Sequence, residues 1–329
     1  MTKKDKNIEY ALNMSMTKIT ICQQEELDSQ IIKTEFNDEF PCHIYMVVKR
    51  PRVTLIPEKC EFNKGKTKLT FRIQDKFEFT EKELLVNTNE DTSDYIIKSE
   101  FPHSKFHIYS KDEKVFSAKS SLLYFMLLNE YSEQMNCEIL YIGQSFGKNG
   151  ERQAPKRLKN HSTLQSIYST AIQNNPDKEI WLLLLSFERS LLTVFDGKNK
   201  ISNQETDLKK ATKIMHMFSQ NELSEKEMIN FTEAGLIKYF QPKYNIIYKE
   251  NFPNPAHSSY KECYDLDVNS ISFDIETDTI KTKLFTEKIK PSFKNIVSYK
   301  LENKEKRKSL FQFGENLDLS NDFFNIKIN

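Results

Sequence analysis

The chain has 329 residues, of which 38% are hydrophobic and 29% charged, a composition typical of a globular protein with about two domains. Its 48 Lys and Arg against 47 Asp and Glu leave a formal charge of +1, which excludes a uniformly basic nucleic-acid coat but not a local basic site. The 24 Phe and 14 Tyr argue against a largely disordered chain.

The first segment, residues 1–116, is predicted to be a β-rich module. Between residues 41 and 110, short runs alternate polar with apolar or aromatic side chains, as in residues 43–48 and 68–73. This alternation is the pattern of half-buried strands. We find no motif in this module that indicates chemistry.

The second segment, residues 117–250, begins with two apolar runs separated by a polar stretch. Residues 121–129 and 137–143 are therefore predicted to form a β-hairpin. Residues 156–172 have helical spacing and follow Pro155, which suits the first turn of a helix. The short apolar run over residues 179–187 fits a buried central strand.

The same segment ends with a predicted helix and a stop signal. The run Ser224-Glu225-Lys226-Glu227 has the capping-box pattern that opens a helix, and Pro242 limits the end of that helix. The third segment, residues 251–329, is predicted to be a linker followed by an extension. Residues 281–308 of this extension hold nine Lys and one Arg against three Glu, a charge block that we interpret as a solvated surface.

No targeting or membrane signal is visible. No apolar run exceeds seven residues, whereas a membrane helix needs about 20, and no apolar stretch follows the basic N-terminus. The five cysteines are widely spaced and include no C-x-x-C pair, which favours reduced thiols over a disulfide framework or a zinc site. We therefore expect a cytoplasmic protein without membrane contact.

Four features that carry chemistry follow one another in the second segment. Tyr141-Ile142-Gly143 ends a predicted strand, and Arg157 and His161 lie four residues apart, hence on one face of the next helix. Glu233 lies on the capped helix among apolar neighbours. The run Gln241-Pro242-Lys243-Tyr244-Asn245 follows that helix directly.

In this order and on these elements, the four features resemble the GIY-YIG nuclease family over about residues 117–250. The resemblance implies a small α/β (α+β) domain with a central antiparallel sheet flanked by helices, here preceded by the β-rich module. It also implies that Tyr141 lines an active site, and that Gly143, which has no Cβ, lets a phosphate approach the backbone.

The remaining residues have expected roles in the same site. Arg157 would hold the scissile phosphate, and His161 would hydrogen-bond the phosphate or the leaving oxygen. The resemblance implies that Glu233 binds one divalent cation, Mg²⁺ or Mn²⁺. Asn245 would either support this metal or cap a turn. A local basic patch suited to a nucleic-acid backbone comprises Lys148, Arg152, Lys156 and Lys159.

The first motif of the family departs from its usual letters, because no Gly-Ile-Tyr occurs in the chain. We assign its tyrosine to Tyr124, on the first strand of the predicted hairpin. Tyr131 lies at a more usual spacing but in the polar turn, and Tyr109 follows His-Ile but lies 32 residues before Tyr141. Tyr124 or Tyr141 would activate the attacking water.

These observations predict a metal-dependent endonuclease that hydrolyses phosphodiester bonds of nucleic acid, with DNA favoured as the polymer. The alternative is a nuclease-like module that has lost its first motif and only binds nucleic acid. Binding without cleavage would be metal-independent and steeply salt-dependent. A third interpretation, an α/β interaction protein in which the motif order is a coincidence, predicts neither property.

Overall fold

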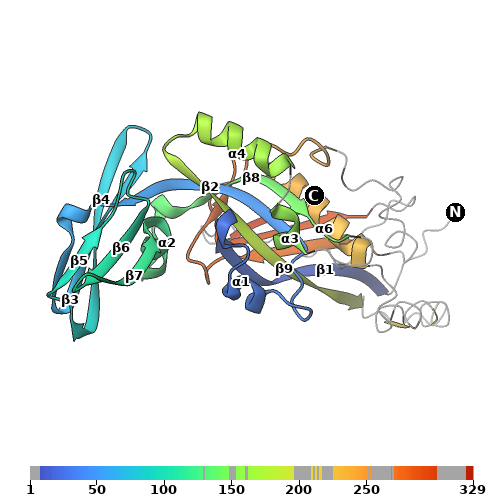
Figure 1. The fold of residues 1–329 in the computed structure, drawn as a ribbon. Coiled ribbons are helices and arrows are strands. Elements are labelled where there is room, and N and C mark those ends of the chain that lie inside the picture. Colours follow the sequence, from blue (N-terminus) through green and yellow to red (C-terminus); the bar gives the residue numbers. More distant parts are fainter. Residues whose placement is uncertain are drawn as a thin grey trace. The chain divides into compact units, whose positions relative to one another are not determined.

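The computed structural model shows a mixed α/β protein that is rich in strands (Figure 1). The structure describes residues 8–128, 130–147, 153–159, 162–195, 209, 212, 215–216, 225–250, 252, 268, 270–301 and 324–328. Within the described part of the chain, no helix combines the length and the apolar character that crossing a membrane requires.

The chain divides into two compact units, each assembled from segments that are not consecutive in the sequence. Unit 1 comprises Met1–Val48, Cys137–Leu164 and Trp181–Asn329, and unit 2 comprises Lys49–Asn136 and Gln165–Ile180. The three consecutive domains expected from the sequence, with boundaries after residues 116 and 250, do not coincide with these units. The chain leaves unit 1 partway along a strand and returns to it nearly 90 residues later, a path that no composition change marks.

Unit 1 is built on a sheet whose strands come from all parts of the chain. Its order is β11 (Leu284–Phe285), β8 (Cys137–Gln144), β2 (Ile44–Leu55), β9 (Lys178–Phe195), β1 (Ile8–Cys22), β10 (Ser270–Glu276), β12 (Lys294–Lys300) and β13 (Phe324–Ile328). β1 pairs antiparallel with β9 but parallel with β10. The sheet is therefore mixed, whereas an antiparallel sheet was expected.

The segment expected to be an extension belongs to the core of unit 1. Helix α6 (Glu225–Phe240) packs against β10, where the Phe273 ring lies so close to Gly235 that a Cβ there would meet it at 2.3 Å. The Tyr299 hydroxyl on β12 donates a hydrogen bond to the Gly235 carbonyl over 2.9 Å. Unit 1 also contains η1 (Gln24–Glu26), α1 (Gln30–Glu35) and α3 (Ala154–Leu158).

Unit 2 contains a long hairpin and a separate three-stranded sheet. The hairpin strands β3 (Glu61–Asp75) and β4 (Glu78–Asp91) continue antiparallel from the end of β2. The separate sheet has the order β5 (Tyr95–Lys98), β6 (Lys105–Ser110) and β7 (Glu113–Lys119). The other elements are η2 (Pro57–Lys59), α2 (Ser120–Leu127) and η3 (Glu133–Met135), and α4 (Ser162–Asn174) continues from unit 1 into unit 2.

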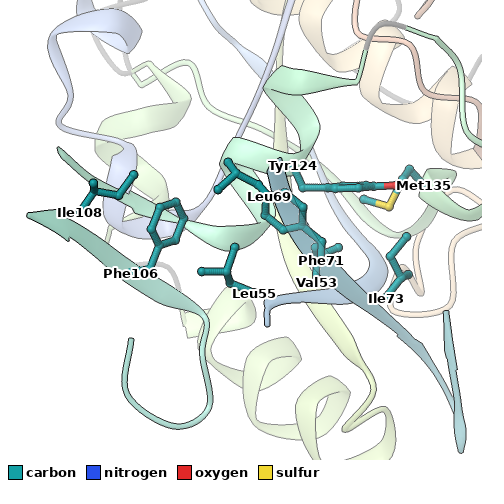
Figure 2. Packing of buried hydrophobic residues seen from close by; sticks show 9 residues of the cluster. All are labelled: Val53, Leu55, Leu69, Phe71, Ile73, Phe106, Ile108, Tyr124 and Met135. Atoms are coloured by element: carbon teal, nitrogen blue, oxygen red, sulfur yellow. The ribbon is translucent and has the colours of Figure 1, made fainter. Parts of the chain in front are cut away.

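The core of unit 2 explains one wrong prediction. Residues 121–129 were expected to be a strand, but residues 120–127 form helix α2. Its Tyr124 ring packs edge-on against Phe71 at a centroid distance of 5.3 Å, within a cluster that also contains Phe106 and Ile108 (Figure 2). A short run that is apolar on all sides shows no period, so burial alone does not separate a helix from a strand.

Other predicted elements are confirmed. Strands β8 and β9 contain the two apolar runs expected to be strands, and helix α6 ends at Phe240, before Pro242. The helix expected over residues 156–172 is divided into α3 and α4. Ser224, the expected first residue of the capping box, lies outside the described residues.

Candidate functional site

The tyrosine beside Tyr141 is Tyr45, which was not among the predicted candidates. Tyr45 lies on β2 and Tyr141 on β8, two neighbouring strands of the sheet in unit 1, and their ring centroids are 6.2 Å apart. Tyr45 follows His43 and Ile44, so a run of letters close to the missing first motif was present in the sequence. The sequence did not indicate that Tyr45 belongs with Tyr141, because 96 residues (141 − 45) separate the two tyrosines.

Tyr124, the residue assigned to the first motif, does not lie on a strand as expected. Its hydroxyl-bearing ring is 1% exposed and enclosed by the hydrophobic core of unit 2, where burial raises its pKa. The side chain lies on a helix rather than on a strand beside β8. Tyr124 therefore has a packing role, whereas Tyr45 is the tyrosine that lies beside Tyr141.

Gly143 is a glycine because of the Tyr45 ring. A Cβ at this position would lie 2.5 Å from the Cζ and hydroxyl oxygen of Tyr45 and 2.8 Å from Cε1 of Tyr141. Both contacts are shorter than side chains tolerate, so only a residue without a side chain allows the two rings to lie over this part of β8. The requirement is one of space rather than of an unusual backbone angle.

The two tyrosine hydroxyls are connected. Burial has the largest effect on both hydroxyls and raises the pKa of each. A hydrogen bond between the two side chains raises the pKa of Tyr45 further and lowers that of Tyr141. The charge of Glu233 raises the pKa of both tyrosines further, and that of Arg157 lowers it. Both charged side chains therefore lie close enough to Tyr45 and Tyr141 to affect their ionisation.

Glu233 is the carboxylate of this site. It lies partly buried on α6, and burial raises its pKa to about 7, against the lowering effects of Arg157 and of hydrogen bonds from the backbone and side chain of Gln144. The Gln144 side chain also donates to Asn230 on the same helix over 2.8 Å. Gln144 follows Gly143 directly, so β8 and α6 hold the carboxyl group between them.

Arg157 is positioned by a short helix that is tied to the start of β2. Pro155 occupies the first turn of α3, as expected, and the Ala154 N–H donates to the Cys42 carbonyl over 2.8 Å. The Arg157 side chain lies near enough to Glu233 to lower the pKa of its carboxyl group. A cation that offers several hydrogen-bond donors therefore lies close to the carboxylate and the two tyrosines.

His43 fastens the loop that follows β8, a role that the sequence did not indicate. The Ser145 N–H donates to the His43 carbonyl over 2.7 Å, and the His43 Nδ1 donates back to the Ser145 carbonyl over 2.7 Å. The imidazole packs on Phe146 at 5.3 Å, and its Nε2 lies 3.6 Å from Oε1 of Glu225, the first residue of α6.

The side chain of Asn245 hydrogen-bonds to the backbone of β8. Its side-chain oxygen accepts from the Ile142 N–H over 2.9 Å, and its amide nitrogen donates to the Ile142 carbonyl over 2.8 Å. With 7% of its surface exposed, the side chain acts as a short extra strand beside the motif residues. This arrangement favours a structural role over metal support.

The other predicted residues are less informative. Lys156 and Lys159 are exposed, as a basic patch requires, but Lys159 forms an ion pair with Asp28. His161, Lys148 and Arg152 lie outside the described residues. Among the described residues, no group of three or more His, Cys, Asp or Glu side chains could hold a metal ion.

The chain matches no protein-family model, and neither the curated proteins nor the solved structures include a significant match.

Proposed function

We propose that unit 1 is a metal-dependent endonuclease of the GIY-YIG type, which hydrolyses phosphodiester bonds of nucleic acid, with DNA favoured as substrate. The observation that carries the proposal is the position of Tyr45, stacked over Gly143 and beside Tyr141. The first motif lacks its usual letters, and Tyr124, which was assigned to it, lies on a helix. Tyr45, on a strand outside the segment that defines the resemblance, is a tyrosine that could serve in its place.

The charged groups match what phosphodiester hydrolysis needs. Arg157 offers several N–H donors to a phosphate and stabilises the charge that develops on it. Glu233 supplies the carboxylate oxygens that divalent cations prefer. Burial raises its pKa to about 7 because it disfavours the ionised form, and a bound cation would stabilise that ionised form in place of the proton. Such a cation, when bound, would stabilise the leaving oxygen and orient the phosphodiester.

The tyrosines would orient the attacking water. Burial raises the pKa of Tyr45 and of Tyr141, so both are neutral phenols at neutral pH. A neutral phenol oxygen accepts a hydrogen bond from water and thereby aims the lone pair of that water at the phosphorus. Burial raises the pKa of both hydroxyls, and the positive field of Arg157 opposes this rise. Arg157 therefore favours the phenolate, the form of either tyrosine that could accept a proton from the attacking water.

The decisive experiment is cleavage of plasmid and short single-stranded DNA with Mg²⁺, Mn²⁺ or EDTA by wild type, Tyr45→Phe, Glu233→Ala and Tyr124→Phe. We expect metal-dependent cutting by wild type and by Tyr124→Phe, the matched core control. Tyr45→Phe and Glu233→Ala should lose it. Cutting by Glu233→Ala at the wild-type rate contradicts the proposal, and salt-sensitive binding without any cutting favours the binding-only alternative.

A further inference from the structure

One side of the three-stranded sheet in unit 2 is buried, which defines its other side. Phe106 and Ile108 on β6 project into the hydrophobic cluster of unit 2 (Figure 2). Because side chains alternate along a strand, Lys105, His107 and Tyr109 project to the opposite side. We call this side the outer face of the β5–β6–β7 sheet.

The strand register identifies the remaining members of the outer face. Residues directly opposite each other in a sheet lie on the same side. The rows across the sheet are Lys105 with Lys119, Lys98 with His107 and Ser117, and Ile96 with Tyr109 and Lys114. The outer face is thus formed by Ile96, Lys98, Lys105, His107, Tyr109, Lys114, Ser117 and Lys119.

The charge of the outer face differs from that of the whole chain. Four of its eight residues are lysines and none is acidic, whereas the chain as a whole holds 48 basic against 47 acidic residues. Lys98, Lys105 and Lys114 are exposed.

Aromatic rings lie among these lysines. The Lys98 Nζ lies 4.6 Å from the centroid of the Tyr109 ring. This cation–π contact keeps the ammonium group on the outer face of the sheet. His107 lies 6.5 Å from Tyr109 between ring centroids and shares a hydrogen bond of 2.8 Å with the Ser117 hydroxyl. Both rings are partly exposed.

We propose that the outer face of the β5–β6–β7 sheet binds the sugar–phosphate backbone of single-stranded nucleic acid. Lysines supply the charge, and Tyr109 and His107 supply surfaces on which bases stack. A binding site of this kind in unit 2 would select and hold the substrate of unit 1. That role, though not the binding itself, rests on the proposed nuclease function.

The test measures binding of the full chain to fluorescent single-stranded DNA in EDTA across a salt series. The variant is Lys98→Ala/Lys105→Ala/Lys114→Ala. Each lost phosphate contact reduces the slope of log K against log salt by about 0.7 for single strands. We expect a slope smaller by about 2, which is about a hundredfold weaker binding at 0.1 M salt.

Two controls make the test specific. The triple variant Lys64→Ala/Lys66→Ala/Lys82→Ala removes the same charge from the β3–β4 hairpin and should leave the slope close to that of wild type. Replacing Lys98, Lys105 and Lys114 with arginine keeps the charge and should preserve binding.

The outcomes separate this inference from the nuclease proposal. Equal slopes for the two alanine variants overturn the outer face as a binding site, even when wild type cleaves DNA. A reduced slope in a protein that never cleaves supports the binding face and leaves only the nuclease proposal refuted. The third outcome concerns anionic membranes. If the Lys98→Ala/Lys105→Ala/Lys114→Ala variant no longer sediments with phosphatidylserine vesicles, as wild type does, but binds DNA as wild type does, the face binds anionic membranes and the inference is overturned.

Discussion

Glu233 makes the stability of the protein depend on pH in a direction opposite to that of most carboxylates. Its pKa is raised from 4.5 to about 7 in the folded protein. Between these values the folded chain retains a proton that the unfolded chain has lost, so the free energy of unfolding falls as pH rises. At 1.36 kcal/mol per pKa unit, the fall between pH 5 and pH 8 is about 2.5 kcal/mol.

The variant Glu233→Gln removes this titration while keeping an oxygen that accepts from Gln144. We expect Glu233→Gln to be more stable than wild type by about 3 kcal/mol at pH 8 and by less than about 1 kcal/mol at pH 5. Urea unfolding at both pH values measures the difference. Mg²⁺ should narrow the gap at pH 8, because a cation that binds the ionised carboxylate stabilises only the wild type.

The matched control is Glu188→Gln, which changes an exposed glutamate on β9. Its stability should follow the wild type at both pH values, because a solvated carboxylate changes its surroundings little on folding. If Glu233→Gln and wild type lose the same free energy between pH 5 and pH 8, Glu233 is not buried beside apolar groups as described. The argument that a cation would replace its proton then fails with it.

Two further changes probe how β8 is held. Gly143→Ala places a methyl group 2.5 Å from the Tyr45 ring, so we expect a loss of about 1–3 kcal/mol in urea unfolding together with impaired cleavage; an unchanged unfolding midpoint would contradict the close packing. Asn245→Ala leaves the buried N–H and carbonyl of Ile142 without their partner and should cost about 2 kcal/mol, with cleavage lost in proportion to folded protein. Full rescue of Asn245→Ala by excess Mg²⁺, without any loss of stability, would instead indicate a metal ligand.

The parts predicted from the sequence are those that local patterns determine. The apolar run of β9, the strand ending in Gly143 and the helix that ends before Pro242 each depend on neighbours within one element, and each is confirmed. Glu233 lies on the last of these elements, and its place near Tyr141 follows from helix α6 packing on β8. Arg157 lies on α3, which begins near Pro155 as expected.

The features that the sequence did not predict depend on pairing between distant segments. Local patterns do not reveal that β1 and β10, about 260 residues apart, are parallel neighbours in the sheet of unit 1. Nor do they reveal that Asn245 forms two hydrogen bonds with Ile142, since an asparagine after a helix is most simply interpreted as a turn residue. Tyr124 was chosen because it lies on the first strand of the predicted hairpin, which assumes that the two motif strands form a tight hairpin.

That assumption is weak on physical grounds. Increasing the connection between two paired strands from about 10 residues to 96 (141 − 45) costs only about 2 kcal/mol of loop-closure entropy, because the cost grows with the logarithm of length. Unit 2 reduces this cost further, since its own hydrophobic cluster orders most of the connection. The close fit of Tyr45 over Gly143 is set by the pairing of β2 with β8, and that pairing is insensitive to what the chain does between them. A tyrosine that packs on Gly143 can therefore come from any strand that pairs with β8, whatever its distance along the chain.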